Sequence, residues 1–416
     1  MKKFHIKWCL SALITTSLCA CVSLDTERPD TMYRQAIMHN LQKDNQYNFS
    51  ANVTLNWEDK TAVSEPSTPL ELENDVDATE AVAVSEADAT WEEMADLVVL
   101  GAARYPVVNT FLKHSHVNMD GAVDLPKGKV ELVPSLNVAT GNYGMWAKLP
   151  MLVDAKNERI LVDAQGYAGW LQTKVDGNPE LNAQIQKLEQ GALLEIKQPE
   201  ESSERYPVKT AVKALPKALE AYLDAMDAKH FALVNVDDYG RSLHARYQVQ
   251  LQYNYLDSLN WTEALLKGYQ AEFARLRKEA PEANVSDKAY EQIESMVLLG
   301  SMLLSQNGAT PKCETNEQGE EVCVQDEAAQ KALAKASKAM PVLQHSLYLN
   351  ASGRILGAQD RLVLQSRQTP KALVYTSKLK LFNHGRPQFT LDSAPRETVS
   401  VWRLAKHLKS DAVSED

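Results

Sequence analysis

The chain has 416 residues, with 55 Asp and Glu against 44 Lys and Arg, and a formal net charge of -11. A chain this acidic has no electrostatic footprint for nucleic acid and is repelled by anionic lipid headgroups. Its length and its 44% content of hydrophobic residues suffice to bury a large core. No apolar stretch approaches the roughly twenty residues of a transmembrane helix. We therefore expect a globular body of two or three domains.

The first twenty residues have the order of a secretory signal. Lys2, Lys3 and Lys7 precede an apolar run from Cys9 to Leu18, and small residues follow. The run is too short to cross a bilayer, so the pattern predicts an export signal rather than a membrane helix.

The end of this signal, Leu18-Cys19-Ala20-Cys21, resembles the lipobox of bacterial lipoproteins, in which the signal is cut before a cysteine that becomes diacylated and N-acylated. The resemblance implies a signal peptide at residues 1–20 and a lipid on Cys21. In that family an aspartate after the lipidated cysteine marks retention in the inner membrane. In this chain Val22 and Ser23 follow Cys21 instead, so the resemblance implies that the protein is anchored in the outer membrane and that its body faces the periplasm. The alternative is an ordinary cleaved signal with an incidental cysteine near its end.

Processing would remove three lysines and change the formal charge from -11 to -14, so the lipid rather than a basic patch would hold the protein at the membrane. Each buried methylene of such an anchor contributes about 0.8 kcal/mol. In an oxidising periplasm Cys313 and Cys323 are expected to form a structural disulfide that contributes about 2–3 kcal/mol. A zinc pair is the alternative, but zinc takes four ligands and no other His or Cys lies close by in the sequence.

The N-terminal part of the predicted body contains one helix and one strand. Residues 21–30 are expected to be a tether, and residues 31–57 a helix (31–42) followed by a strand. From Tyr47 to Trp57 apolar and polar residues alternate, which is typical of a half-buried strand. Residues 58–90 are predicted to be an acidic disordered insertion, because 58–96 hold thirteen carboxylates and one lysine without a sustained apolar period. For this insertion we favour a solvated linker over the alternative, an acidic segment that binds a basic partner.

Two β-meanders are predicted on either side of a helical region. Residues 91–200 form the first meander region, with a helix at 91–103 and strands at 116–125, 129–138, 143–150 and 159–167. Residues 341–394 form the second meander, with strands at 343–350, 355–366 and 372–382, a short strand that ends near Leu391, and a polar C-terminal tail at 395–416. The segments 111–115 and 342–346 open the meanders with similar sequences, through internal duplication or coincidence.

Residues 201–340 are expected to be mainly helical with one hairpin. A helix over 206–227 is predicted to kink or restart at Pro216. The hairpin spans 231–255, and the next helix is expected to be capped by Asn260 with Glu263. Ser286 caps a further helix, and a last helix covers 327–340.

The chain contains no recognisable catalytic motif. His114 and His116 could begin a metal site, but Asp120 and Asp124 are the only nearby candidates for further ligands. We therefore expect the two histidines to be hydrogen-bonded within the protein or exposed to solvent. Asp237, Asp238 and Gly240 are better explained as turn residues than as a cation loop. No Gly-x-Ser-x-Gly elbow, His-Glu-x-x-His or phosphate loop is present. We therefore predict no catalytic residue, no metal, no cofactor and no enzymatic activity.

Aromatic residues gather in two places. The first meander region contains Trp146, Trp170, Tyr143 and Tyr167, and the central hairpin contains Tyr247, Tyr253 and Tyr255. They could form the wall of a lipid or glycan groove, but strands favour aromatic residues on a buried face, so a role in the core is preferred.

Together these elements predict an α+β fold in which a twisted antiparallel sheet or half-barrel packs against several amphipathic helices. The pattern is similar to the half-barrels of LolA, LolB and the mycobacterial lipoprotein carriers, without a functional residue that can be matched. We expect a non-enzymatic lipoprotein that binds a lipid or another apolar ligand. The alternative is a scaffold or interaction subunit of a cell-envelope complex, with a protein partner. A lined cavity between sheet and helices would support the first function.

Overall fold

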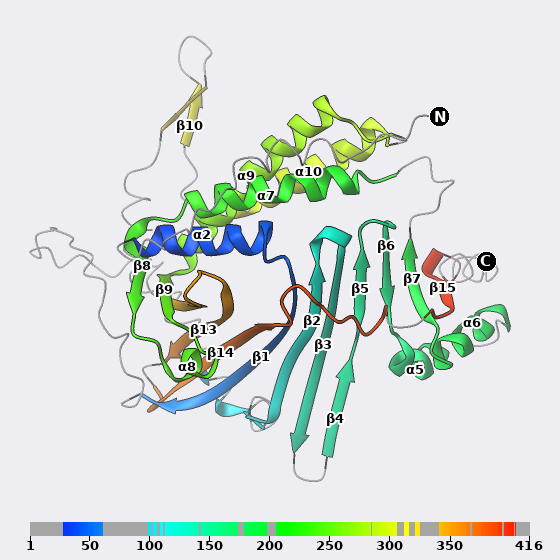
Figure 1. Cartoon of the computed structure of the whole chain (residues 1–416), viewed down its shortest axis with the longest axis horizontal. Helices are drawn as coiled ribbons and strands as arrows, with labels where there is room; N and C mark the ends of the chain where they lie inside the picture. Colours follow the sequence, from blue (N-terminus) through cyan, green and yellow to red (C-terminus); the bar gives the residue numbers. More distant parts are fainter. Residues whose placement is uncertain are drawn as a thin grey trace, which may run out of the picture.

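The computed structural model shows one large sheet with helices across one face (Figure 1). It describes residues 28–60, 99–100, 103–105, 109–110, 113–140, 143–173, 179–197, 205–283, 285–305, 312–315, 321–324, 341–366, 368–392, 395–402 and 404. The predicted signal peptide, Cys21, most of the acidic insertion and the helix expected at 327–340 lie outside these residues.

The elements of this part of the chain are as follows. The helices are α2 (Pro29–Gln42), α5 (Ala168–Gln172), α6 (Pro179–Glu189), α7 (Val208–Asp224), α8 (Asp238–Ser242), α9 (Tyr255–Glu279) and α10 (Asp287–Ser305). The strands are β1 (Gln46–Asp59), β2 (Ser115–Asp124), β3 (Lys129–Thr140), β4 (Tyr143–Lys148), β5 (Met151–Asp154), β6 (Arg159–Val162), β7 (Leu193–Lys197), β8 (Phe231–Val234), β9 (Tyr247–Tyr253), β10 (Lys312–Thr315), β11 (Glu321–Val324), β12 (Leu343–Leu349), β13 (Ile355–Gln365), β14 (Lys371–Phe382) and β15 (Thr398–Ser400).

The two predicted meanders join in one 13-stranded sheet. Its order is β15-β7-β6-β5-β3-β2-β1-β14-β13-β12-β9-β8, and β4 pairs with β3 beside β5. The described strand pairs are antiparallel except β7 with β15. The central strand β1 pairs with β2 on one side and with β14 on the other. The predicted α+β class is confirmed.

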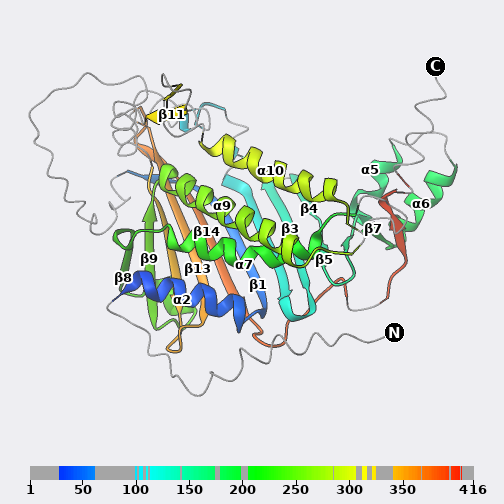
Figure 2. The same ribbon diagram turned by 90° about the horizontal axis from the view of Figure 1, so that it is seen from above.

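Alternation along the strands gives this sheet two different faces: one is largely apolar around β1, and the other is polar along β1 but holds smaller apolar clusters elsewhere. On β1, Phe49, Val53 and Trp57 share a face with their register partners Leu381, Ser377 and Leu373 on β14. Intervening residues such as Asn52 point to the opposite face. We call the first face the inner face, because α2, α7 and α9 pack on it (Figure 2).

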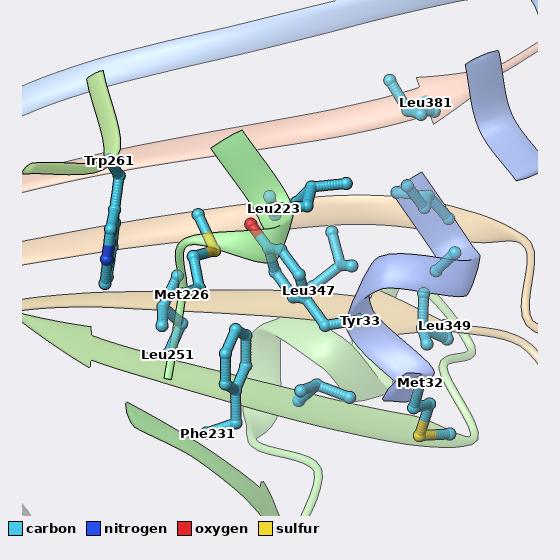
Figure 3. Packing of buried hydrophobic residues seen from close by; sticks show 14 residues of the cluster. Met32, Tyr33, Leu223, Met226, Phe231, Leu251, Trp261, Leu347, Leu349 and Leu381 are labelled. Atoms are coloured by element: carbon cyan, nitrogen blue, oxygen red, sulfur yellow. The ribbon is translucent and has the colours of Figure 1, made fainter. Parts of the chain in front are cut away.

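The main core lies between α2, the facing ends of α7 and α9, and strands β8, β9, β12, β13 and β14. Met32 and Tyr33 from α2 meet Leu223 of α7, Met226 just after this helix, and Trp261 from α9 (Figure 3). The sheet side of this core is apolar and buried, and consists of Phe231, Val249, Leu251, Leu347, Leu349, Ile355, Ala358 and Leu381. Burial of these side chains fixes the helices on the sheet.

Helices α7, α9 and α10 pack against one another beyond this core. Phe273 of α9 contacts Tyr290 of α10 and Ala214 of α7 in a small separate cluster. A Cβ atom at Gly268 would lie 2.6 Å from Cβ of Ala221, so the close approach of α7 and α9 requires glycine there. Pro216 lies inside α7, which continues through it as one helix.

The start of α9 corrects one prediction. Asn254, at the end of β9, accepts a hydrogen bond from the Asp257 N–H at 3.0 Å, and Asp257 accepts one from the Asn254 N–H at 3.0 Å. This capping box begins the helix before Asn260, the predicted cap, which therefore lies within the helix. The predicted cap at Ser286 is confirmed, because its hydroxyl oxygen accepts from the Ala289 N–H at 3.3 Å.

A strap of residues 383–392 crosses the outer face from β14 toward β15 (Figure 1). Buried Glu131 on β3 accepts the Thr390 and Leu391 backbone N–H groups at 2.9 and 2.8 Å, and the Thr390 hydroxyl at 2.7 Å. Leu391 is buried against Leu152. The strand predicted to end near Leu391 does not form, because this segment bonds to side chains of the sheet instead of to a neighbouring strand. β15 lies within the segment predicted as a polar tail, with Val399 buried.

Helix α8 covers the outer face near β9 and β12. The Asp237 carboxylate accepts hydrogen bonds from the Gly240 N–H at 2.7 Å and from the Tyr348 hydroxyl at 2.7 Å. Burial, followed by the Asp237 carboxylate, raises the pKa of Tyr348, so the hydroxyl stays a neutral donor. Asp237 is therefore the N-cap of α8 and Gly240 lies within this short helix, where the sequence predicted turn residues.

The sequence missed some features of the first meander region. The strand predicted at 143–150 ends at Lys148 as β4, and a further strand that was not predicted, β5, follows it. The strand predicted at 159–167 ends at Val162, with α5 following. Trp146 and Trp170 are 66% and 62% exposed, so their predicted place in a core is wrong.

The strap predicts a local contribution of Glu131 to stability. Glu131→Gln turns a charged acceptor into an amide whose NH₂ group faces backbone donors, so we expect the free energy of unfolding to fall by about 2 kcal/mol. Urea unfolding followed by circular dichroism measures this change, and hydrogen exchange should show faster exchange at Leu391. The control is Glu189→Gln, which alters an exposed carboxylate. Unchanged stability and unchanged exchange at Leu391 would contradict the role of Glu131.

Candidate functional site

Beyond the main core, polar groups stand in a row on the inner face. The register places His345 of β12 opposite Asp360 of β13, and Asp360 opposite Ser377 of β14. The same row continues through Val53 of β1 to Val117 of β2. His345, Asp360, Ser377 and Val53 are half-buried. An imidazole, a carboxylate and a hydroxyl thus interrupt an otherwise apolar surface.

The histidine and the aspartate in this row form a pair. Nδ1 of His345 lies 2.6 Å from Oδ1 of Asp360, and the Tyr33 ring meets the imidazole edge-on at a centroid distance of 5.8 Å. In a nucleophilic triad the imidazole stands between the hydroxyl and the carboxylate. Here Asp360 stands between His345 and Ser377, so the three residues do not have the order of such a triad.

Tyrosines lie beside the row. Tyr33 of α2 packs on His345, and Tyr253 of β9 and Tyr375 of β14 occupy the next inward positions on the side away from Leu347. Burial, followed by Tyr222, Asp360 and Tyr375, raises the pKa of Tyr253 to about 12. Burial, followed by Tyr222, Tyr253 and Asp360, also raises the pKa of Tyr33. These phenols are therefore neutral at physiological pH and do not add negative charge to the site.

The inner face of β1 to β4 is apolar but incompletely covered. Val117 and Met119 of β2 are 41% and 39% exposed, and Met145 of β4 is 53% exposed. Register partners between them are also apolar: Ala51 and Val53 on β1, Pro134, Leu136 and Val138 on β3, and Ala147 on β4. We call these residues the open patch. An apolar patch that remains exposed on one face of a sheet is typical of a binding surface.

A pocket of about 270 Å³ lies where the inner faces of β1 and β14 end. We call it the rim pocket; its lining is Trp57, Ala103, Asn109, Lys113, Thr369, Pro370 and Lys371. The Trp57 indole N–H donates to Oδ1 of Asn109 at 3.2 Å, which fixes the ring at the pocket wall. The pocket thus combines an aromatic surface with two lysines.

The residues considered for a metal site do not come together. His114 and His116 are exposed, and so is Asp120. Asp124 is buried and ion-paired with Lys127 at 2.8 Å. Within the described ranges, no group of three or more His, Cys, Asp or Glu is placed to hold a metal ion.

The sequence analysis did not select the row or the rim pocket. The row joins residues from three strands, and the rim pocket joins chain segments near 57, 109, 113 and 370, so pairing register rather than local spacing creates them. One feature of the sequence could have pointed to the row: a charged or polar residue at a position where the alternation of the strand expects an apolar one, as at His345 and Asp360. Of the aromatic residues selected from sequence, Tyr247 and Tyr253 pack against the main core, while Tyr255 is exposed.

Comparison of the chain with protein-family models, with curated proteins and with solved structures finds no match. The likeness to the half-barrel carriers therefore stays an expectation from the sequence. In the described part of the chain, no helix is both long enough and apolar enough to cross a bilayer.

The small hairpin β10–β11 predicts a disulfide. The register makes Cys313 and Cys323 direct partners. Directly opposed residues of antiparallel strands have Cα atoms about 4.5–5.5 Å apart, within the range that a disulfide spans. In protein isolated from an oxidising compartment, we expect alkylation at neither residue before reduction and at both afterwards, as measured by peptide mass spectrometry. Complete alkylation of both thiols without reductant would contradict the prediction.

Proposed function

We propose that this protein binds an amphiphilic ligand, lipid or lipid-like, along the inner face of its sheet and does so without catalysis. The apolar part of the ligand lies on the open patch and on the neighbouring inner residues of β14. The polar row at His345, Asp360 and Ser377 and the rim pocket supply hydrogen-bonding groups at either end of this surface.

The observation that carries the proposal is the uneven cover of the apolar face. Near α2 the inner residues are buried, as at Leu347 and Leu349, whereas Val117 and Met119 on β2 remain exposed although their neighbours are apolar. Exposed apolar surface costs about 25 cal/mol for each Å² that burial would remove from water. A bound hydrocarbon chain would recover this free energy.

A second candidate is the interaction subunit of a cell-envelope complex. It is favoured by Trp146, which is 66% exposed on β4, and by the position of that strand, which pairs only with β3 among the described strands. An exposed aromatic side chain on a strand edge suits the addition of a partner strand. A stoichiometric protein bound through β4, and lost in Trp146→Ala, would favour this function.

We propose further that the protein is held at the bacterial outer membrane through a lipid on Cys21 and faces the periplasm. The support is the lipobox resemblance of Leu18-Cys19-Ala20-Cys21. A lipid anchor would place the inner face of the sheet within reach of membrane amphiphiles.

The binding function is tested with Val117→Glu. The new carboxylate would lose hydration against a hydrocarbon chain, so we expect the amount of bound amphiphile to fall at least tenfold. Native mass spectrometry of full-length protein extracted from its own membrane measures the bound mass. The matched control is His116→Glu, which adds the same group to the adjacent residue on the other face of β2. Equal loading of the wild type and Val117→Glu, or no amphiphile on either, would reject the proposal.

The anchor is tested with Cys21→Ser. A serine hydroxyl accepts no thioether-linked lipid, so we expect the variant to leave the membrane fraction and to lose the mass of its acyl groups. Fractionation and intact-mass measurement report the two effects. Cys19→Ser is the matched control and should leave both unchanged. Unaltered partitioning of Cys21→Ser would contradict lipidation at this position.

A further inference from the structure

We infer that the rim pocket binds an anionic headgroup, so that the ligand of the inner face is an anionic amphiphile with its charge at the Trp57 end. This inference rests on the proposed function and specifies the ligand class of the same surface. The shared chemistry is a carboxylate or phosphate group attached to a hydrocarbon chain.

The rim pocket is continuous with the inner face in register. Trp57 follows Val53 and Leu55 on the inward positions of β1, and its partner on β14 is Leu373. Lys113 precedes β2 by two residues and lines the pocket with Trp57 and Lys371. A ligand chain on the open patch therefore has its polar end at these lysines.

The charge at the rim favours an anion. Lys113 and Lys371 are exposed, and within the described part of the chain neither forms an ion pair with a carboxylate. Lys60 lies beside them, with its ammonium group bonded to the Ser366 carbonyl oxygen. Asp59, opposite Lys371 on β1, is the carboxylate at this strand end. In a chain with a net charge of -11, such a cluster of lysines forms a locally positive site that attracts anions.

The length of the surface fits one hydrocarbon chain. On β1, four residue steps separate Trp57 of the rim pocket from Val53 of the open patch, which corresponds to about 13 Å along the strand. One leaflet of a bilayer has a hydrocarbon thickness of about 15 Å. A single acyl chain with its headgroup at Lys371 would therefore end near the row of His345, Asp360 and Ser377.

The opposite orientation is less favourable. A negative headgroup at the row would meet the Asp360 carboxylate, and like charges in a half-buried site repel. The rim pocket offers the ammonium groups of Lys113 and Lys371 as donors. The Thr369 hydroxyl already donates to the Lys371 carbonyl oxygen at 2.7 Å. The pocket volume of about 270 Å³ suits a headgroup rather than a whole lipid.

The inference is tested with chain-matched probes on full-length protein. Palmitate and dipalmitoyl-phosphatidylglycerol are the anionic probes, and hexadecanol and dipalmitoylglycerol are their neutral counterparts. We expect wild-type protein to bind at least one anionic probe about tenfold more tightly than its neutral counterpart, through charge-assisted hydrogen bonds that salt weakens. Preference for palmitate indicates a fatty acid, and preference for the phosphodiester indicates a phospholipid. Titrations by native mass spectrometry give the dissociation constants.

The double variant Lys113→Glu/Lys371→Glu should lose the preference and keep its affinity for the neutral probes. The control variant Lys156→Glu/Lys380→Glu makes the same change in net charge, with Lys380 on the outer face of β14. Equal wild-type affinities for charged and neutral probes, or a preference retained in the double variant, would overturn the rim inference alone. If no probe binds to wild-type protein, both this inference and the proposed function fail.

Discussion

The structure depends on one constraint, the need to cover the larger apolar face of a very wide sheet. Alternation along β1 and its neighbours sends most of their apolar side chains to one side, and β1 joins the two meanders so that these sides coincide. Helix α2 and the facing ends of α7 and α9 bury the part formed by β8, β9, β12, β13 and β14. Over β2 and β4 the cover is incomplete, and this difference between two halves of one surface separates the stabilising core from the candidate site.

The outer face combines smaller apolar clusters, such as Leu152 with Leu391, with directional polar contacts. There buried carboxylates accept backbone and hydroxyl donors: Glu131 holds the strap and Asp237 holds the start of α8 and Tyr348. Such contacts are directional, because a buried acceptor without its donors is costly. They fix where the chain crosses the sheet and leave the inner face free of the returning polypeptide.

Much of the fold could be predicted from the sequence, because period-two alternation is a local signal. β2, β3, β12, β13 and β14 lie within a few residues of their predicted limits. Helix α9 begins earlier than predicted, since Asn254 and Asp257 form a capping box that competes with the pattern at Asn260. Exposed Trp146 shows that a β-forming residue need not be buried. The row could not be predicted, because it depends on the register between three consecutive strands of the second meander. The rim pocket could not be predicted, because it joins β1 and β14, which lie in distant parts of the chain.

The pairing of β1 with β14 has a consequence for how the protein folds. Asn48 pairs with Phe382, so the central strand has one of its two neighbours near the far end of the polypeptide. Contacts this distant in sequence slow folding, because a large loop must close before they form. During synthesis the apolar side of β1 lacks this neighbour until almost the whole chain has emerged. Apolar surface exposed for that time promotes aggregation, so a holding chaperone would benefit this chain more than a protein built from local hairpins.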